Sequence, residues 1–130
     1  LVAQIYDDLG ETEKAEESRR RGIRAAEERL RMHPDDSRAL YMGANGLVGL
    51  GDYDRGLEWA AQALTIDGDE PMVLYNVACI HSLAHRYEDA LGSLERAVRS
   101  GLKHKNWVLH DSNLDPLRRF PRYKKLIQQF

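Results

Sequence analysis

Apolar and small side chains recur along the chain with a spacing of 34 residues. Aligning the sequence with itself at this offset pairs identical residues at six positions: Leu40 with Leu74, Tyr41 with Tyr75, Ala44 with Ala78, Tyr53 with Tyr87, Leu57 with Leu91, and Ala63 with Ala97. A fixed period of this length is typical of arrays in which each repeat is one supersecondary unit. We therefore expect two consecutive copies of one unit, residues 37–70 and 71–104.

Each unit is expected to form two helices joined by a turn. Gly51 supplies a left-handed stop after the first helix of residues 37–70, and Asp52 can cap the second. In residues 71–104 the turn falls at His85 and Arg86, and Gly101 ends the unit. The pattern predicts helices over residues 37–50, 53–66, 71–84 and 87–100.

The N-terminal segment matches an altered copy of the same unit. Residues 9–15 align with residues 50–56 at an offset of 41, and the seven extra residues add almost two whole helical turns. One long helix is therefore expected from residue 11 or 12 to His33, stopped before Pro34. Because Leu1 to Leu9 have the pattern of a helix end, we expect residues 1–36 to be a truncated unit and the chain to be a piece of a longer protein.

Residues 105–130 depart from the repeat and are expected to form a helical cap. Pro116 and Pro121, each suited to a helix start, predict two or three short helices. The terminal repeat of a solenoid needs its exposed end covered. The apolar side chains available for this are Trp107, Leu114, Leu117, Phe120, Tyr123 and Leu126.

Composition agrees with an all-α fold. Ala and Leu together occupy 30 positions, whereas Val, Ile and Thr together occupy 13. Straight-chain residues and Ala favour helices, and β-branched residues favour strands. At 130 residues, the chain is also too short for a TIM barrel.

Charge and cysteine content bear on the partners and the cellular compartment that we expect for this protein. The formal net charge is -2, which gives no overall attraction to nucleic acid or to an anionic membrane. The distribution is uneven, since residues 99–130 hold eight Lys and Arg but only two acids. The single Cys79 fits a reducing compartment, and the absence of a long apolar run gives no sign of a membrane span. We expect a cytoplasmic protein.

The two regular units resemble the tetratricopeptide repeat (TPR) family, whose helix hairpins place small residues at three fixed positions. Those positions hold Ala44, Gly56 and Ala63, then Ala78, Ala90 and Ala97. Departures from the family pattern occur at Gly43, Gly68 and His81. The resemblance implies a right-handed α-solenoid. Residues 75–126 also resemble the segment that closes many bacterial TPR regions, which often form the C-terminal part of adenylate or guanylate cyclases and serine/threonine kinases.

The resemblance implies a concave groove lined by the first helix of each hairpin. The residues that it carries over as candidate partner-binding groups are Arg38, Tyr41, Met42, Asn45, Gly49, Met72, Tyr75, Asn76 and Cys79, with Val48, Ser82 and Leu83 on the same face. Family members that clamp a C-terminal carboxylate use asparagine where Asn45 and Asn76 stand, but Tyr41 replaces the first lysine of that clamp. An apolar peptide, extended or helical, fits these residues better. The alternative is that the Tyr and Met side chains only pack against neighbouring helices.

No catalytic or cofactor motif is present. The sequence lacks the phosphate-binding, dinucleotide-binding, zinc-protease and nucleophile-elbow patterns. His81 and His85 are four residues apart and could share a metal, but Cys79 lies 200° from His81 around the helix. We therefore expect no enzyme activity, no cofactor and no metal site.

A protein-interaction module, a scaffold or adaptor that binds a peptide or protein segment, is the function most consistent with the sequence. The alternative is a C-terminal regulatory region of a bacterial signalling enzyme whose catalytic domain lies outside this chain. Homo-oligomers are a further possibility, because a cut first repeat exposes an apolar face. Nucleic-acid binding by the basic segment is less favoured than a solvated cap surface, and no membrane partner is expected.

Three glycines in the first helix of residues 37–50 call for an explanation. Gly43, Gly46 and Gly49 fall three residues apart, and each costs up to about 1 kcal/mol relative to Ala inside a helix. Either very close helix packing or a ligand backbone must offset this cost. We favour packing.

Overall fold

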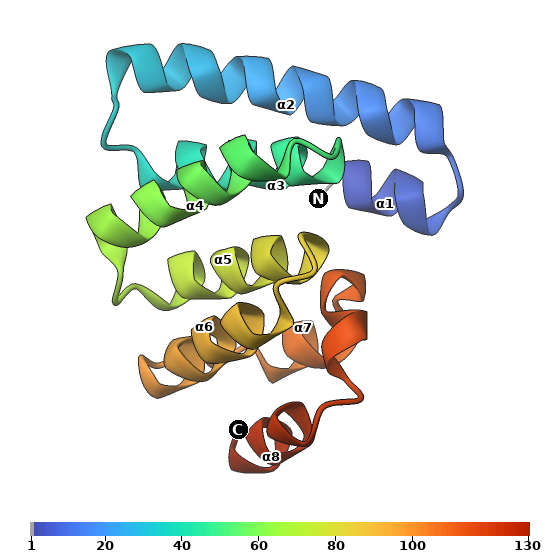
Figure 1. Cartoon of the computed structure of the whole chain (residues 1–130), viewed down its shortest axis with the longest axis vertical. Helices are drawn as coiled ribbons and strands as arrows, with labels where there is room; N and C mark the ends of the chain where they lie inside the picture. Colours follow the sequence, from blue (N-terminus) through green and yellow to red (C-terminus); the bar gives the residue numbers. More distant parts are fainter. Residues whose placement is uncertain (1) are drawn as a thin grey trace.

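The computed structural model describes residues 2–130, which form nine helices and no strand. The elements, in chain order, are α1 (Val2–Asp8), α2 (Thr12–Met32), α3 (Ser37–Gly49), α4 (Tyr53–Asp67), α5 (Pro71–Leu83), α6 (Tyr87–Arg99), α7 (Lys105–His110), the 3-10 helix η1 (Ser112–Leu117) and α8 (Pro121–Gln129) (Figure 1). The all-α prediction is confirmed. The predicted long helix is α2, and the four predicted repeat helices end within one residue of their expected bounds.

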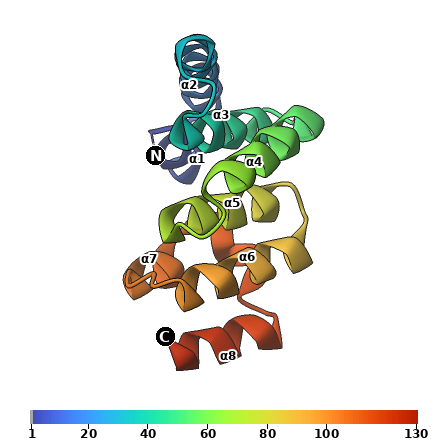
Figure 2. The same cartoon turned by 90° about the vertical axis from the view of Figure 1, so that its left-hand side faces the viewer.

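From α2 onward the helices form an elongated stack that broadly follows chain order, and α1 lies below α2 beside α3 (Figure 1). Each of α1 to α5 packs against the next helix, and α3 also contacts α5. The cap helices η1 and α8 contact α6, and η1 contacts α5. In both views α2 lies at one end of the stack and α8 at the other (Figure 1, Figure 2).

Turn chemistry fixes where the helices end. Gly51 and Gly101 have φ of +91° and +111°, the left-handed conformation that glycine adopts without strain. His85 holds the equivalent turn position at φ +62°, a backbone conformation that residues other than glycine adopt less readily. The Asp52 side chain accepts a hydrogen bond from the Arg55 amide at 3.4 Å, as its expected capping role requires.

The buried residues form two clusters that share α5. One cluster lies between α3, α4 and α5 and includes Leu40, Ala44 and Val77; the other joins α5 and α6 to the cap. Neighbouring residues of α5 such as Val73 and Leu74 are buried on opposite sides, so this helix is apolar nearly all round. The central helix of the stack is thus also its most buried one.

The cap has the expected number of short helices but differs from the prediction at two residues. Pro121 begins α8, whereas Pro116 lies inside η1, because the Asp111 side chain starts that helix by accepting from the Asn113 amide at 3.0 Å. Trp107 does not cover the end of the stack. It remains 43% exposed, because its ring stacks on that of His104 with centroids 3.9 Å apart.

The remaining cap side chains behave as predicted. Leu114 and Leu117 are fully buried, and Tyr123 and Leu126 are nearly so. Ion pairs from Arg122 of α8 to Glu88 and Glu95 of α6, both at 2.6 Å, hold the cap on the stack. At least one basic residue of this segment, Arg122, therefore forms ion pairs within the protein.

The α1 helix leaves apolar side chains exposed at the N-terminal end. Val2, Ile5 and Leu9 are 61%, 57% and 70% exposed. They match the exposed face that the truncated unit predicts. Self-association that would cover this face stays a prediction.

Close helix packing accounts for the glycine stripe of α3. A Cβ atom at Gly43 would lie 2.3 Å from the Trp59 ring, and one at Gly46 would lie 3.0 Å from Ile23 of α2. At Gly49 the side chain of Arg19, also from α2, occupies the space. The glycines thus let α2 and α4 approach α3, as the sequence suggested.

We predict that Gly43→Ala lowers the free energy of unfolding by about 1–2 kcal/mol, because the overpacking strain outweighs the gain in helix propensity. Gly22→Ala is the matched control, since Gly22 lies inside α2 with nothing within 4 Å of the added methyl group. The control should be neutral or more stable than the parent in urea denaturation. Equal stabilisation by both substitutions would show that Gly43 is not at a close contact.

Candidate functional site

A groove of about 550 Å³ opens between α3, α5 and α7. Eight of the nine candidate residues from the sequence line it: Arg38, Tyr41, Met42, Asn45, Met72, Tyr75, Asn76 and Cys79. The structure therefore brings these residues of two repeats together on one concave surface. Its lining is mainly apolar.

Gly49 and three further residues of the expected face lie elsewhere. Gly49 is exposed and faces Arg19 of α2. Val48 is buried in the core cluster of α3, α4 and α5, and Leu83 packs against the same cluster. Ser82 donates a hydrogen bond to the Asn113 carbonyl oxygen at 2.6 Å and so helps to hold η1.

Six groove residues were not predicted from the sequence: Gln4, Asn106, Trp107, His110, Asp111 and Asn113. A signal existed for Gln4, because it aligns with Asn45 at the offset of 41 and hence with Cys79 one period later. All three equivalent positions reach the groove. The other five lie in the cap, where the period is lost and no alignment could place them.

Aromatic and thioether side chains form the apolar walls. Tyr41 and Tyr75 are buried, and Met42 and Met72 are half-buried. Trp107 packs against Tyr75 with ring centroids 5.9 Å apart and remains 43% exposed. Burial raises the pKa of both tyrosines, so the phenols stay neutral.

The two asparagines of the groove differ in what they can offer. Asn76 donates from Nδ2 to the Met72 carbonyl at 2.8 Å, within its own helix, and keeps its side-chain oxygen available. The Asn45 amide makes no hydrogen bond to any described residue. Asn45 can thus both donate to and accept from a bound backbone.

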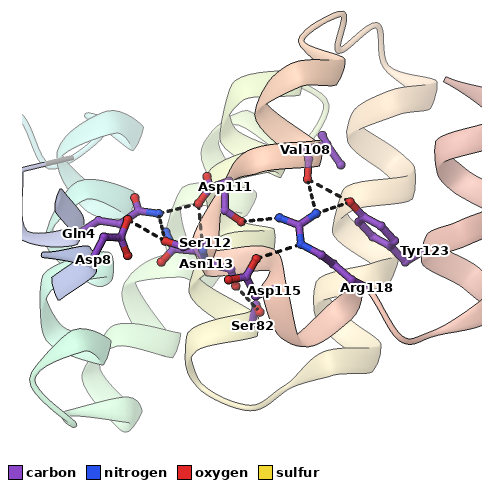
Figure 3. Close-up of polar contacts among 10 residues, drawn as sticks. All are labelled: Gln4, Asp8, Ser82, Val108, Asp111, Ser112, Asn113, Asp115, Arg118 and Tyr123. Atoms are coloured by element: carbon purple, nitrogen blue, oxygen red, sulfur yellow. Dashed lines mark hydrogen bonds and ion pairs between the residues drawn. The ribbon is translucent and has the colours of Figure 1, made fainter. Parts of the chain in front are cut away.

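The floor of the groove is the Asp111 carboxylate, which accepts from four groups (Figure 3 shows part of this network). Gln4 Nε2 and the Asn113 amide donate to Oδ1 at 2.7 and 3.0 Å. The Tyr75 hydroxyl donates to Oδ2 at 2.6 Å, and the Cys79 thiol lies 3.7 Å from the same oxygen. A carboxylate has about four lone-pair sites. Asp111 is therefore saturated by groups from α1, α5 and η1.

Arg118 fixes the main chain on either side of this floor. Its guanidinium donates to the carbonyl oxygens of Val108 at 3.1 Å and of Asp111 at 2.9 Å (Figure 3). These are the carbonyl groups at the end of α7, where helical partners are missing. One half-buried arginine thus sets the angle between α7 and η1, which is the wall that carries Trp107.

Cys79 and His81 do not form reactive centres. Burial raises the pKa of the Cys79 thiol, so the thiolate is disfavoured. His81 has a buried Nδ1 atom without a partner, whereas His85 Nδ1 lies 3.0 Å from the Tyr87 hydroxyl. Among residues 2–130, no three His, Cys, Asp or Glu side chains are grouped to hold a metal ion.

No protein-family model matches the chain, and no curated protein sequence matches it. Within the described residues, none of the helices has the length and apolar content needed to cross a membrane. The groove is therefore the feature from which a function can be inferred.

We predict that Asp111→Ala lowers the free energy of unfolding by about 2–3 kcal/mol, because four donors lose their acceptor at once. Asp115→Ala is the control, since that exposed carboxylate pairs only with Arg118 three residues away and should matter by less than about 1 kcal/mol. Urea denaturation of both variants measures the difference. Similar losses of unfolding free energy in the two variants would show that Asp111 contributes no more to stability than Asp115.

His81 should make stability depend on pH. Burial lowers its pKa from 6.5, with Asp89 opposing and Arg86 reinforcing the effect. The unfolded chain therefore takes up a proton more readily, so stability present above pH 6.5 falls as the pH drops below it.

His81→Phe should weaken this pH dependence and raise the free energy of unfolding by about 1 kcal/mol, because it removes the unpartnered nitrogen. Melting temperatures at about pH 7.5 and 5.5 test this. His33→Gln, at an exposed histidine, should keep the parental pH dependence. An unchanged slope in His81→Phe would show that His81 is not its source.

Proposed function

We propose that this chain is a non-catalytic protein-interaction module of the TPR type, a right-handed solenoid that binds a peptide or protein segment in its concave groove. The observation that carries the proposal is the convergence of eight candidate residues, from two repeats, on one groove. The first helices of the two repeats, α3 and α5, provide them, as a TPR array would require.

The chemistry of the groove suits a polypeptide ligand. Apolar Met, Tyr and Trp walls provide binding area, and Trp and Tyr are the residues that most often dominate binding energy at interfaces. The amide of Asn45 and the oxygen of Asn76 can pair with backbone groups of a bound segment. Such a groove binds extended or helical segments through alternate apolar side chains.

The groove does not favour a carboxylate clamp. Tyr41 stands where the clamp has its first lysine, and the hydrogen-bonded oxygens of Asp111 form the floor. A C-terminal carboxylate buried there would face another carboxylate. The ligand is therefore an internal, mainly apolar segment. The module would act in the same way if it regulates a catalytic domain elsewhere in a longer bacterial signalling protein.

Selection from a display library of random peptides long enough to span the groove tests this function. Peptides enriched on the parent protein should lose about tenfold or more in affinity to a Trp107→Ala, Asn45→Ala variant, because truncating an interface hot spot costs about 2 kcal/mol. The control variant, Ile66→Ala with Gln62→Ala, changes exposed residues of α4 and should bind as the parent does. Loss of binding in the control, or none in the groove variant, would place the binding surface elsewhere.

A further inference from the structure

A second concave pocket of about 480 Å³ continues the groove toward α2. Small residues of α2, such as Ala25 and Ala26, line it, and it shares Arg38 and Met42 with the main groove. The two pockets are therefore parts of one path over the surface. Arg38 lies at their junction.

Arg38 is an exposed cation whose side chain lies beside the Tyr41 hydroxyl. No ion pair joins it to any residue from 2 to 130. The acids nearest to it in sequence and in the repeat are occupied, since Asp36 accepts from Arg29 Nε at 2.8 Å and from the Ala39 amide at 3.0 Å. Glu70 accepts from the Val73 amide at 3.0 Å, capping α5. Both carboxylates thus act as helix caps, and neither forms an ion pair with Arg38.

The other charge of the groove is already satisfied. All four acceptor sites of Asp111 are used by Gln4, Tyr75, Cys79 and Asn113. A cation from a ligand finds no free lone pair there, whereas an anion can pair with the exposed guanidinium of Arg38.

Arg38 lies between two parts of the path. The main groove, which Gln4 of α1 and Asn113 of η1 line beside Asp111, lies on one side of it, and the second pocket lies on the other. A bound segment that fills both pockets must therefore pass over Arg38 rather than end at it.

Building on the proposed binding function, we infer that the groove recognises an acidic-apolar segment. An internal Asp or Glu side chain pairs with Arg38, and apolar side chains on either side of it occupy the two pockets. The carboxylate is a side chain and not a chain terminus, because the path continues on both sides of Arg38. A large apolar residue of the bound segment lies in the main groove, against Trp107 and Met72.

The same display selection, repeated on an Arg38→Glu variant, tests the inference. On the parent protein, enriched peptides should carry Asp or Glu at a fixed distance from Leu, Met or aromatic residues. On Arg38→Glu the acidic position should be lost or replaced by Lys or Arg. Arg24→Glu makes the same charge change on an exposed site of α2 outside both pockets, and it should keep the acidic preference.

Synthetic peptides measure how much the acidic residue contributes to affinity. An enriched peptide with a blocked C-terminus should bind the parent about fivefold more tightly than its Glu→Gln twin, the upper range for a partly exposed ion pair. This difference should shrink at high salt and vanish on Arg38→Glu. A peptide cut after the acidic residue, with a free α-carboxylate, should bind more weakly.

The outcomes separate the inference from the function. Enriched apolar peptides with no fixed acidic residue, or tighter binding by the cut peptide, would overturn the inference and leave groove binding intact. No enrichment on the parent protein would overturn both.

Discussion

One carboxylate, that of Asp111, holds three parts of the chain around the groove. Gln4 from α1, Tyr75 and Cys79 from α5, and the start of η1 all meet on it, although Gln4 and Asp111 are 107 residues apart in sequence. Asp111 is partly buried, so separating these groups would leave polar atoms with fewer partners. The groove therefore has a fixed floor, and the cap is a part of the binding surface as well as a cover for the last repeat.

The repeats and the cap make different contributions. Small residues such as Ala44 and Ala78 let α3 to α6 pack closely, and they bury both faces of α5. This leaves the first helix of each repeat with its Tyr, Met and Asn side chains on the concave side. The cap then adds Trp107, the most exposed aromatic ring of the groove, and Arg118 sets the angle of the helix that carries it. Apolar walls come from the repeats, and the hot-spot candidate comes from the cap.

The sequence predicted the fold well wherever the period of 34 residues held. Helix bounds, the turns at Gly51 and Gly101 and the close packing at Gly43 follow from residues that act locally or through a repeated contact. The resemblance to the TPR family implied eight of the groove residues. It could not place Trp107 or Asp111, because these depend on how one unrepeated segment folds back on α5. Gly49 shows the converse limit, since a position on the expected face lies against the Arg19 side chain of a neighbouring helix.

Hydrogen exchange, measured with and without an enriched peptide, tests the account most directly. The account predicts slower exchange of the backbone amides on binding in α3, α5 and α7, which form the groove, and in α1, whose Gln4 lines it. It predicts no change in α4 and α6, which contribute no residue to it. Protection confined to α4, α6 or α8 would show that the groove is not the binding surface.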